Sequence, residues 1–258
     1  MTRKLAFLIL HTGKPYLRYA IQSILPQVDK LMIFYSPKPS QGHQTDMACP
    51  DTESDLLMEV LDLQTPDAKI QWNVGNWSNE TDHVNAVQAF TDGFDWLVRL
   101  DADEIFPPGM VNEMIRQADK YPAVNDFRIP FVHGWRSFSK CCRDGSHPIR
   151  LTRIGQSATV GRLNGLKGTV TLDSQNGKWE VWHGGYAQPT KYIVYKQMVS
   201  GHKSEWRPDW FKDRWMANAQ KDCHPVIHPT HWMAEDFDKS KMPTLMHQHP
   251  YFSMDLIE

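Results

Sequence analysis

Three acidic residues directly follow an apolar segment in the sequence "DWLVRLDADEIF", residues 95–106. Asp101, Asp103 and Glu104 fall within four positions, and carboxylates so close repel one another unless a positive charge lies between them. A hard divalent cation, Mg²⁺ or Mn²⁺, supplies that charge and prefers oxygen ligands. The alternative is an acidic turn that caps the next helix. The position of the acids directly after a buried strand favours the metal site.

The elements that must position these acids alternate between strands and helices. Apolar runs predict buried strands at 4–10, 31–35, 69–74 and 95–100, and helical spacing predicts helices at 16–25, 51–63 and from 78 or 79 to 94. This order is typical of an open α/β sheet with mostly parallel strands. Ligands of such sheets bind at the carboxyl ends of the strands, which is where Asp101 falls.

Beyond residue 106 the alternation becomes less regular. We expect a helix after Pro107 and Pro108, strands at 127–132, 149–154 and 168–172, and a helix at 189–200. The length of 258 residues fits a single domain over residues 1–258. The first half is therefore expected to be the scaffold, and the second half to complete a site.

The strand end "WLVRLDADE" resembles the DxD motif of glycosyltransferases with the GT-A fold, in particular the family 2-like enzymes. The segments "FLILHTGKPYLRYAIQSIL" and "GNWSNETDHVNAVQAFTDGFDWLVRLDADE" are similar to the family's first strand and helix and to the helix before the DxD strand. The resemblance covers residues 4–106. It implies a Rossmann-like α/β fold with helices on both faces of a mostly parallel central sheet, a small second sheet and a helical C-terminal part.

The same resemblance implies a function and roles for single residues. The function is transfer of a sugar from a nucleotide-sugar donor, such as a UDP-sugar, to a hydroxyl acceptor. Asp101 and Asp103 would hold Mn²⁺ or Mg²⁺, and the metal would bridge the two donor phosphates. His11 and Thr12 would lie around the nucleotide base, and Asn85 stands where the family often has an asparagine. Residues 1–106 would bind the donor, and residues 107–258 would bind the acceptor and cover the active site.

A later segment, "VWHGGYAQPTKYIVYKQMVSG" at 181–201, resembles a "HYG" segment followed by Pro and a Lys-bearing helix in a subset of these enzymes. The similarity implies that His183 is a third metal ligand. Neutral imidazole is a suitable partner for Mn²⁺ beside carboxylates. We expect His183 in a loop, because it follows the predicted strand "WEVW" and precedes Gly184 and Gly185.

The sequence departs from the family at the catalytic base. Inverting members often carry an acidic pair after the second sheet, and residues 130–200 contain no such pair. Asp144 is the best-placed single acid along the chain, with Glu205 and Asp209 as rivals. Inversion or retention at the sugar therefore stays open.

The middle of the chain is basic. Residues 128–221 hold 16 Lys and Arg against 6 Asp and Glu, although the whole chain has a net charge of −2. Such a block indicates an anionic ligand, and the alternative is a scatter of solvated side chains. One or two basic residues would stabilise the leaving diphosphate, and Arg162 and Lys196 are our candidates from the pool Arg150, Arg153, Arg162, Lys167, Lys191, Lys196 and Lys203. The surplus of positive charge favours an anionic acceptor as well.

The acceptor itself has two interpretations. A carbohydrate or lipid-linked saccharide is the first. The second is a hydroxymethylated DNA base, because "HKSEWRPDWFKDRW" at 202–215 interleaves cations with aromatic rings. The tryptophans of this segment also have a simpler interpretation as helix core.

The C-terminal part contains the segments "CHPVIHPTHWM" and "MHQHPYF". We interpret them as a loop over the active site with one histidine near the donor or metal, and a structural zinc site is the alternative. Two other function classes stay open for the whole chain: a nucleotidyltransferase with an acidic metal site, and a non-catalytic protein that binds saccharide or nucleic acid.

Cysteine usage and hydropathy indicate a compartment. Cys49, Cys141, Cys142 and Cys223 form no CxxC pair, which favours a reducing environment. The longest apolar run, "LAFLIL", is too short for a membrane span or a signal peptide. We therefore expect a cytoplasmic protein.

Overall fold

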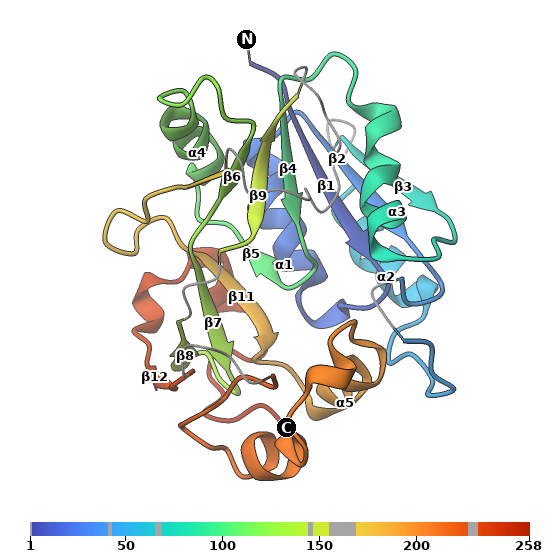
Figure 1. Ribbon diagram of the computed structural model, residues 1–258, viewed down its shortest axis with the longest axis vertical. Coiled ribbons are helices and arrows are strands. Elements are labelled where there is room, and N and C mark those ends of the chain that lie inside the picture. Colours follow the sequence, from blue (N-terminus) through green and yellow to red (C-terminus); the bar gives the residue numbers. More distant parts are fainter. Residues whose placement is uncertain (1, 41–42, 65–68, 144–146, 155–168, 227–231) are drawn as a thin grey trace.

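The computed structural model describes residues 2–40, 43–64, 69–143, 147–154, 169–226 and 232–258. These residues form a seven-stranded and a five-stranded β-sheet with helices packed around them (Figure 1). The strands of the larger sheet are, in spatial order, β10 (Thr169–Thr171), β6 (Asp126–Arg128), β9 (Ile149–Arg153), β4 (Trp96–Leu100), β1 (Lys4–Leu10), β2 (Lys30–Tyr35) and β3 (Ile70–Val74). Neighbouring strands are parallel except around β9, which is antiparallel to both β4 and β6.

The central strand β1 shows why helices cover both faces of this sheet. Side chains alternate between the faces of a strand, and β1 is apolar on both. Ala6 and Leu8 pack with α1 (Lys14–Ile24) and α2 (Glu53–Leu61), whereas Leu5 and Phe7 pack with α3 (Glu80–Asn85) and the following 3₁₀ helix Ala86–Phe90. The predicted α/β class with a mostly parallel central sheet is confirmed.

Helix boundaries follow local signals in the sequence. The helix expected from residue 78 or 79 begins after Asn79, whose side chain accepts a hydrogen bond from the backbone N–H of Asp82. Thr52 and Asp55 form a capping box at the start of α2. The other predicted helices are present as α1, α4 (Met110–Ala118) and α5 (Thr190–Val199).

The strands of the smaller sheet are, in spatial order, β12 (Glu235–Asp236), β8 (Lys140–Cys142), β7 (Phe131–Trp135), β11 (Val181–Tyr186) and β5 (Glu104–Ile105). The single strand expected at 127–132 is wrong, because Pro130 divides it into β6 of the larger sheet and β7 of the smaller one. Both sheets also mix the two halves of the chain. Strands after residue 106 complete the larger sheet, and β5 joins the smaller one.

The C-terminal segment packs on the body of the protein. His249 is buried, stacks on Tyr16 at 4.7 Å between ring centroids, and donates from Nε2 to the carbonyl of Pro15 at 2.9 Å. Trp210 and Trp215 are buried against Trp135, so they belong to an aromatic core cluster. Among the described helices, none combines the length and apolar character that crossing a bilayer requires.

Candidate functional site

A pocket lies at the carboxyl ends of β1 and β4, facing α5. Its walls come from the end of β1 and the following loop, the turn after β4, strand β11 and helix α5, with the lining residues Ile9, Leu10, His11, Thr12, Gly13, Pro39, Ser40, His83, Asp101, Ala102, Asp103, His183, Gln188, Tyr192, Lys196 and Val199. The predicted residues His11, Thr12, Asp101, Asp103, His183 and Lys196 therefore line one pocket. This is the edge at which open α/β sheets bind their ligands.

The loop after β1 and the turn after β4 touch at Gly13 and Ala102. A Cβ added to Gly13 would lie 2.5 Å from the Cβ of Ala102, and Gly13 has a φ of 143° that L side chains rarely adopt. The small residue between the two aspartates is thus needed for packing. It lets the loop with His11 and Thr12 approach the turn with Asp101 and Asp103.

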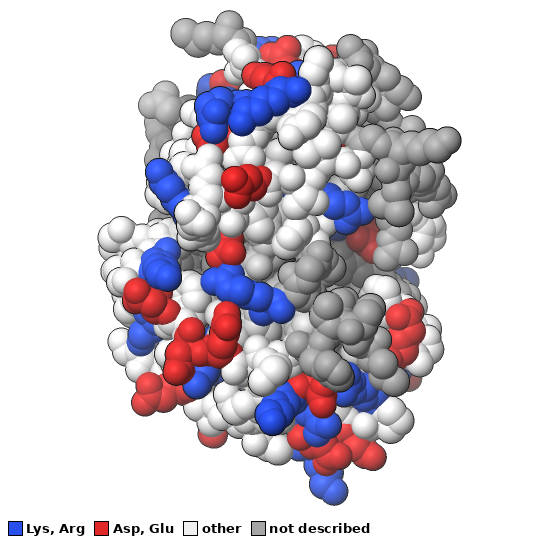
Figure 2. All heavy atoms as spheres, turned by 60° about the vertical axis from the view of Figure 1, so that its left-hand side comes forward, with Lys and Arg blue, Asp and Glu red and all other residues white. Residues whose placement is uncertain are grey.

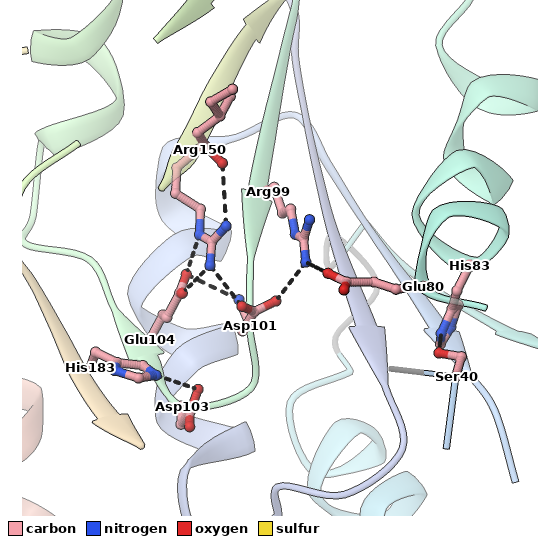
Figure 3. A network of polar contacts seen from close by, with 10 residues as sticks. Ser40, Glu80, His83, Arg99, Asp101, Asp103, Glu104, Arg150 and His183 are labelled. Atoms are coloured by element: carbon pink, nitrogen blue, oxygen red, sulfur yellow. Dashed lines mark hydrogen bonds and ion pairs between the residues drawn. The ribbon is translucent and has the colours of Figure 1, made fainter. Parts of the chain in front are cut away.

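Arg150, on β9, neutralises part of the acidic turn (Figure 3). Its guanidinium is buried, donates from Nε to Glu104 Oε2 at 2.8 Å, and donates from Nη2 to Asp101 Oδ2 at 2.7 Å. Glu104 also accepts the backbone N–H of Asp101 at 3.1 Å and is fully buried. Burial raises the pKa of Glu104, and the adjacent charge of Arg150 opposes that rise. Glu104 therefore fixes the turn. Arg150 supplies positive charge that we had expected to come only from a metal ion.

Asp101 is the more strongly ionised of the two predicted metal-binding aspartates. Burial works against its charge, but the guanidinium groups of Arg150 and Arg99 outweigh burial and lower the pKa of Asp101. Arg99 Nη2 lies 3.7 Å from Asp101 Oδ1 and 3.0 Å from Glu80 Oε1 (Figure 3). Within the described part of the chain, Asp101 Oδ1 accepts no hydrogen bond, although it is buried. An oxygen in that state can still accept a ligand.

Asp103 faces His183 across the pocket wall, with 3.6 Å between Asp103 Oδ1 and His183 Nε2 (Figure 3). Burial raises the pKa of Asp103. Burial also lowers the pKa of His183 well below its usual range, so the imidazole is neutral. The other ring nitrogen, Nδ1, lies 2.8 Å from Nδ1 of His133, which leaves Nε2 directed at Asp103.

The expected loop position of His183 is wrong. His183 lies within β11 and pairs with His133 of β7 and with Glu104 of β5. The glycines after it permit close approach: a Cβ at Gly184 would lie 2.6 Å from the Tyr16 ring, and one at Gly185 would lie 2.4 Å from the His183 ring. The two glycines are thus explained by close packing against aromatic rings. The sequence pattern did not distinguish this cause from a loop.

The acidic and imidazole side chains of the pocket offer few ligands for a divalent cation. Within the described residues, no three His, Cys, Asp or Glu side chains gather as a metal-binding group. Two ligands of one ion, each about 2.0–2.2 Å from it, have a separation close to that of Asp103 Oδ1 and His183 Nε2. Mg²⁺ commonly takes one or two carboxylates and completes its shell with substrate phosphates and water. Asp103 and His183 could therefore supply two ligands of one ion.

The loop after β1 is held from two sides. His11 donates from Nδ1 to the carbonyl of Ser36 at 2.8 Å, and its Nε2 lies 2.7 Å from the hydroxyl of Tyr195 on α5. Burial lowers the pKa of His11, so this side chain is also neutral. Thr12 donates its hydroxyl hydrogen to Asp51 at 2.7 Å.

Lys196 supplies positive charge at the same pocket. Its Nζ lies 3.4 Å from the carbonyl oxygen of Gly185 and 4.8 Å from the centroid of the Tyr186 ring. A carbonyl oxygen and a ring face orient an ammonium group without neutralising it. Lys196 is therefore able to pair with an anion in the pocket.

Several predicted residues lie elsewhere. Asn85 does not line the pocket, and its side chain accepts a hydrogen bond from Gln88 at 3.3 Å. Asp209 is exposed and Glu205 pairs with His202 at the surface, so neither lines the pocket. Asp144 and Arg162 lie outside the described residues.

The basic residues of the middle block are partly paired internally. Arg143 pairs with Glu180 and Glu235, and Arg153 lies 3.5 Å from Asp119. On the face in Figure 2, Lys and Arg side chains alternate with Asp and Glu among the coloured atoms. This distribution favours local ion pairs over a continuous basic surface.

Sequence reasoning did not predict the contacts of three residues of the site. His83 lines the pocket, donates from Nε2 to the carbonyl of Phe34 at 2.7 Å, and accepts from the hydroxyl of Ser40 at 2.6 Å. Burial lowers the pKa of His83 to about 4. Arg150 and Asp51 are the other two. Asp51 directly precedes the capping residue Thr52, which was a local sign of a polar position. Its partners Thr12 and Tyr192, however, lie far away in the sequence.

No family model matches the chain, and no curated protein matches it. Among solved structures, S. aureus TarS 1–349 has a TM-score of 0.42 at 8% identity, covering 71% of this chain and 61% of that one. This chain therefore spans less than two thirds of the TarS fragment.

Two further solved structures show likenesses of the same kind. A putative nucleotide-diphospho-sugar transferase from Desulfovibrio desulfuricans G20 has a TM-score of 0.39 at 14% identity, covering 67% of this chain and 80% of that one. A 4-diphosphocytidyl-2C-methyl-D-erythritol synthase from Anaerococcus prevotii DSM 20548 has a TM-score of 0.42 at 7% identity, covering 76% and 96%. At these identities and TM-scores the likeness assigns no function.

Proposed function

We propose that this protein is a metal-dependent glycosyltransferase that takes a sugar from a nucleotide-sugar donor. The observation that carries the proposal is the convergence of Asp101, Asp103, His183 and Lys196 on one pocket at the carboxyl edge of a mostly parallel sheet. This combination offers acidic and imidazole ligands for a cation together with the ammonium group of Lys196, which pairs with no carboxylate among the described residues, for an anion. A diphosphate bound through Mn²⁺ or Mg²⁺ requires both.

The donor diphosphate is proposed to lie between Lys196 on one side and the Asp103–His183 pair on the other. His183 offers the lone pair of Nε2 when its proton is on Nδ1 and is donated to Nδ1 of His133. The bound cation would act as a Lewis acid on the leaving diphosphate. Lys196 would stabilise the negative charge that develops on the diphosphate, because a positioned ammonium group attracts an anion beside it.

The remaining residues orient the donor. The loop with His11 and Thr12 is proposed to surround the nucleoside, since it forms the wall next to the turn of Asp101. Arg150 keeps Asp101 ionised and fixed. Asp144 remains our candidate for the base that accepts the proton of the acceptor hydroxyl, because its segment connects β8 with β9, the strand that carries Arg150.

The proposal can be tested without knowing the acceptor. Nucleotide sugars with different bases are incubated with the protein and Mn²⁺, and release of nucleoside diphosphate is followed. Slow hydrolysis of one donor that stops on chelation supports the proposal, and its loss in Asp103→Asn assigns it to this pocket. Release of pyrophosphate from a nucleoside triphosphate would instead indicate nucleotidyl transfer. Binding that does not respond to a chelator would indicate a non-catalytic binding protein.

A further inference from the structure

Asp51 connects two segments of the pocket wall, the loop after β1 and helix α5. It precedes α2, is 4% exposed, and is not part of the pocket lining. Its Oδ2 accepts hydrogen bonds from the Thr12 hydroxyl at 2.7 Å, the Gly13 N–H at 2.8 Å and the Lys14 N–H at 3.1 Å. Its Oδ1 accepts the hydroxyl of Tyr192, which lies on α5.

These bonds occupy the amino terminus of α1. The first N–H groups of a helix attract anions, and here the carboxylate of Asp51 takes the N–H groups of Gly13 and Lys14. The same N–H groups are therefore not available to a donor phosphate. Positive charge for the phosphates therefore has to come from elsewhere in the pocket. Lys196 on α5 lines the pocket and carries such a charge.

A second link joins the same two segments. The hydroxyl of Tyr195 on α5 contacts Nε2 of His11 at 2.7 Å. Tyr192, Tyr195 and Lys196 are three and four residues apart on α5, so they share one face of the helix. Tyr195 therefore contacts the loop after β1 directly, and Tyr192 reaches it through Asp51, while Lys196 from the same face lines the pocket.

We propose that Asp51 is a positioning residue that sets the distance between the loop after β1 and Lys196, and thereby the affinity for the donor diphosphate. This inference rests on the proposed function, because it names the group that prepares that site. Asp51 touches no ligand. It acts through Thr12 and Tyr192.

The first test needs no ligand. Cys49 lies beside this link, with Sγ 3.9 Å from the carbonyl of His11, and it is the cysteine that is not buried, whereas Cys141, Cys142 and Cys223 are. Burial and the charge of Asp51 both raise the pKa of the Cys49 thiol, so the quantity to compare is the rate constant of the thiolate, taken from the pH dependence of the reaction with Ellman's reagent in the native protein. That rate constant reports opening of this wall. We expect Asp51→Asn to raise that rate about tenfold or more, because it replaces charged acceptor bonds with weaker ones.

The matched control is Asp55→Asn. Asp55 is also a carboxylate at the start of α2, where it completes the capping box and pairs with Lys14 Nζ at 2.7 Å. Its loss weakens α2 without touching Thr12 or Tyr192, so the rate at Cys49 should stay within about twofold of wild type. Tyr192→Phe cuts only the link to α5 and should raise the rate by about threefold. It keeps the proposal testable if Asp51→Asn does not fold.

The second test measures binding of UDP, GDP, CDP and dTDP in MnCl₂ by calorimetry. For the nucleotide that wild type binds, we expect Asp51→Asn to raise Kd about tenfold, Tyr192→Phe about threefold and Asp55→Asn not at all. An unchanged Cys49 rate in both Asp51→Asn and Tyr192→Phe overturns the proposal. A faster rate with unchanged Kd also overturns it, because the link would then be structural only.

The two proposals fail in different ways. If wild type binds none of the four nucleotides, the proposed function fails, and the rates at Cys49 still decide whether Asp51 holds the wall. If wild type binds one of them and both variants bind it equally well, only the role of Asp51 fails.

Discussion

Arg150 donates a hydrogen bond from Nη2 to Asp101 Oδ2 at 2.7 Å, and through the same guanidinium it holds the fully buried Glu104. One guanidinium group thus pairs with two of the three acidic residues after β4. The third acid, Asp103, faces His183 instead. The acidic turn is therefore divided into a structural part and a part that is open to a ligand.

Arg150→Met should destabilise the protein by about 3–5 kcal/mol at neutral pH, because Glu104 would stay buried without its partner. Urea denaturation followed by tryptophan fluorescence measures this. Combining the change with Glu104→Met should restore most of the loss. As a control, Arg116→Met removes an exposed arginine that pairs with Glu113 and should leave the free energy of unfolding nearly unchanged. A loss equally small for Arg150 would show that the buried pair is not needed for stability.

Lys196→Met should weaken binding of a nucleoside diphosphate about tenfold or more, with little change for the corresponding nucleoside, because Lys196 acts on the phosphates. Lys191→Met is the matched control. Lys191 lies on the same helix, also contacts a ring face, but is exposed and does not line the pocket. Equal effects of the two changes on affinity would argue against a role of Lys196 in the pocket.

The adjacent glycines of β11 should respond differently to alanine. At Gly184 the new Cβ meets the buried Tyr16 ring, so the free energy of unfolding should fall by about 1–3 kcal/mol. At Gly185 the new Cβ meets the His183 ring and lies 3.0 Å from Lys196 Nζ. Gly185→Ala should therefore mainly reduce metal-dependent nucleotide binding. Thermal denaturation and calorimetry of both variants check this, and the reverse pattern would contradict it.

Acid should destabilise the protein through His249. Burial lowers the pKa of His249 to about 4, whereas an unfolded histidine titrates near 6.5. The unfolded chain takes up the proton first, so this contribution to stability is complete above pH 6.5 and is lost as the pH falls to 4. The slope approaches about 1.4 kcal/mol per pH unit. His249→Gln should remove this contribution to the pH dependence of the free energy of unfolding, measured by urea denaturation at several pH values. The carboxylates contribute equally to both proteins, so the difference between the two curves isolates His249. Parallel curves for the two proteins would refute the assignment.

Much of the fold follows from local patterns. The strands and helices up to residue 100 were predictable because β1, β2 and β4 are apolar on both faces, α1 has an apolar helical face, and α2 and α3 begin with side-chain caps. Asp101 and Asp103 could be placed at the edge of the sheet for the same reason. The division at Pro130 was not predictable from the apolar pattern, because buried apolar residues continue across it from Phe127 to Val132 and only the sheet order separates the two strands.

The partners of the site residues were less accessible. Arg150 meets Asp101 because β9 lies antiparallel beside β4, with Val98 opposite Leu151. That neighbour is set by the topology of the whole sheet, and a basic residue 49 positions away gives no local sign of it. Asp51 and Tyr192 are separated by 141 positions and meet for a similar reason. Sequence patterns located the chemistry at the strand end, and the long-range packing determined its charge balance.

The most direct test of the central claim is calorimetric titration of nucleoside diphosphates into wild type and Asp103→Asn, each with MnCl₂ and with a chelator. We predict that at least one nucleoside diphosphate binds wild type only with Mn²⁺, and that Asp103→Asn folds normally but loses this binding. Binding of equal strength in the chelator, or in Asp103→Asn, would contradict a metal-assisted diphosphate site in this pocket, and so would the absence of binding by every nucleotide.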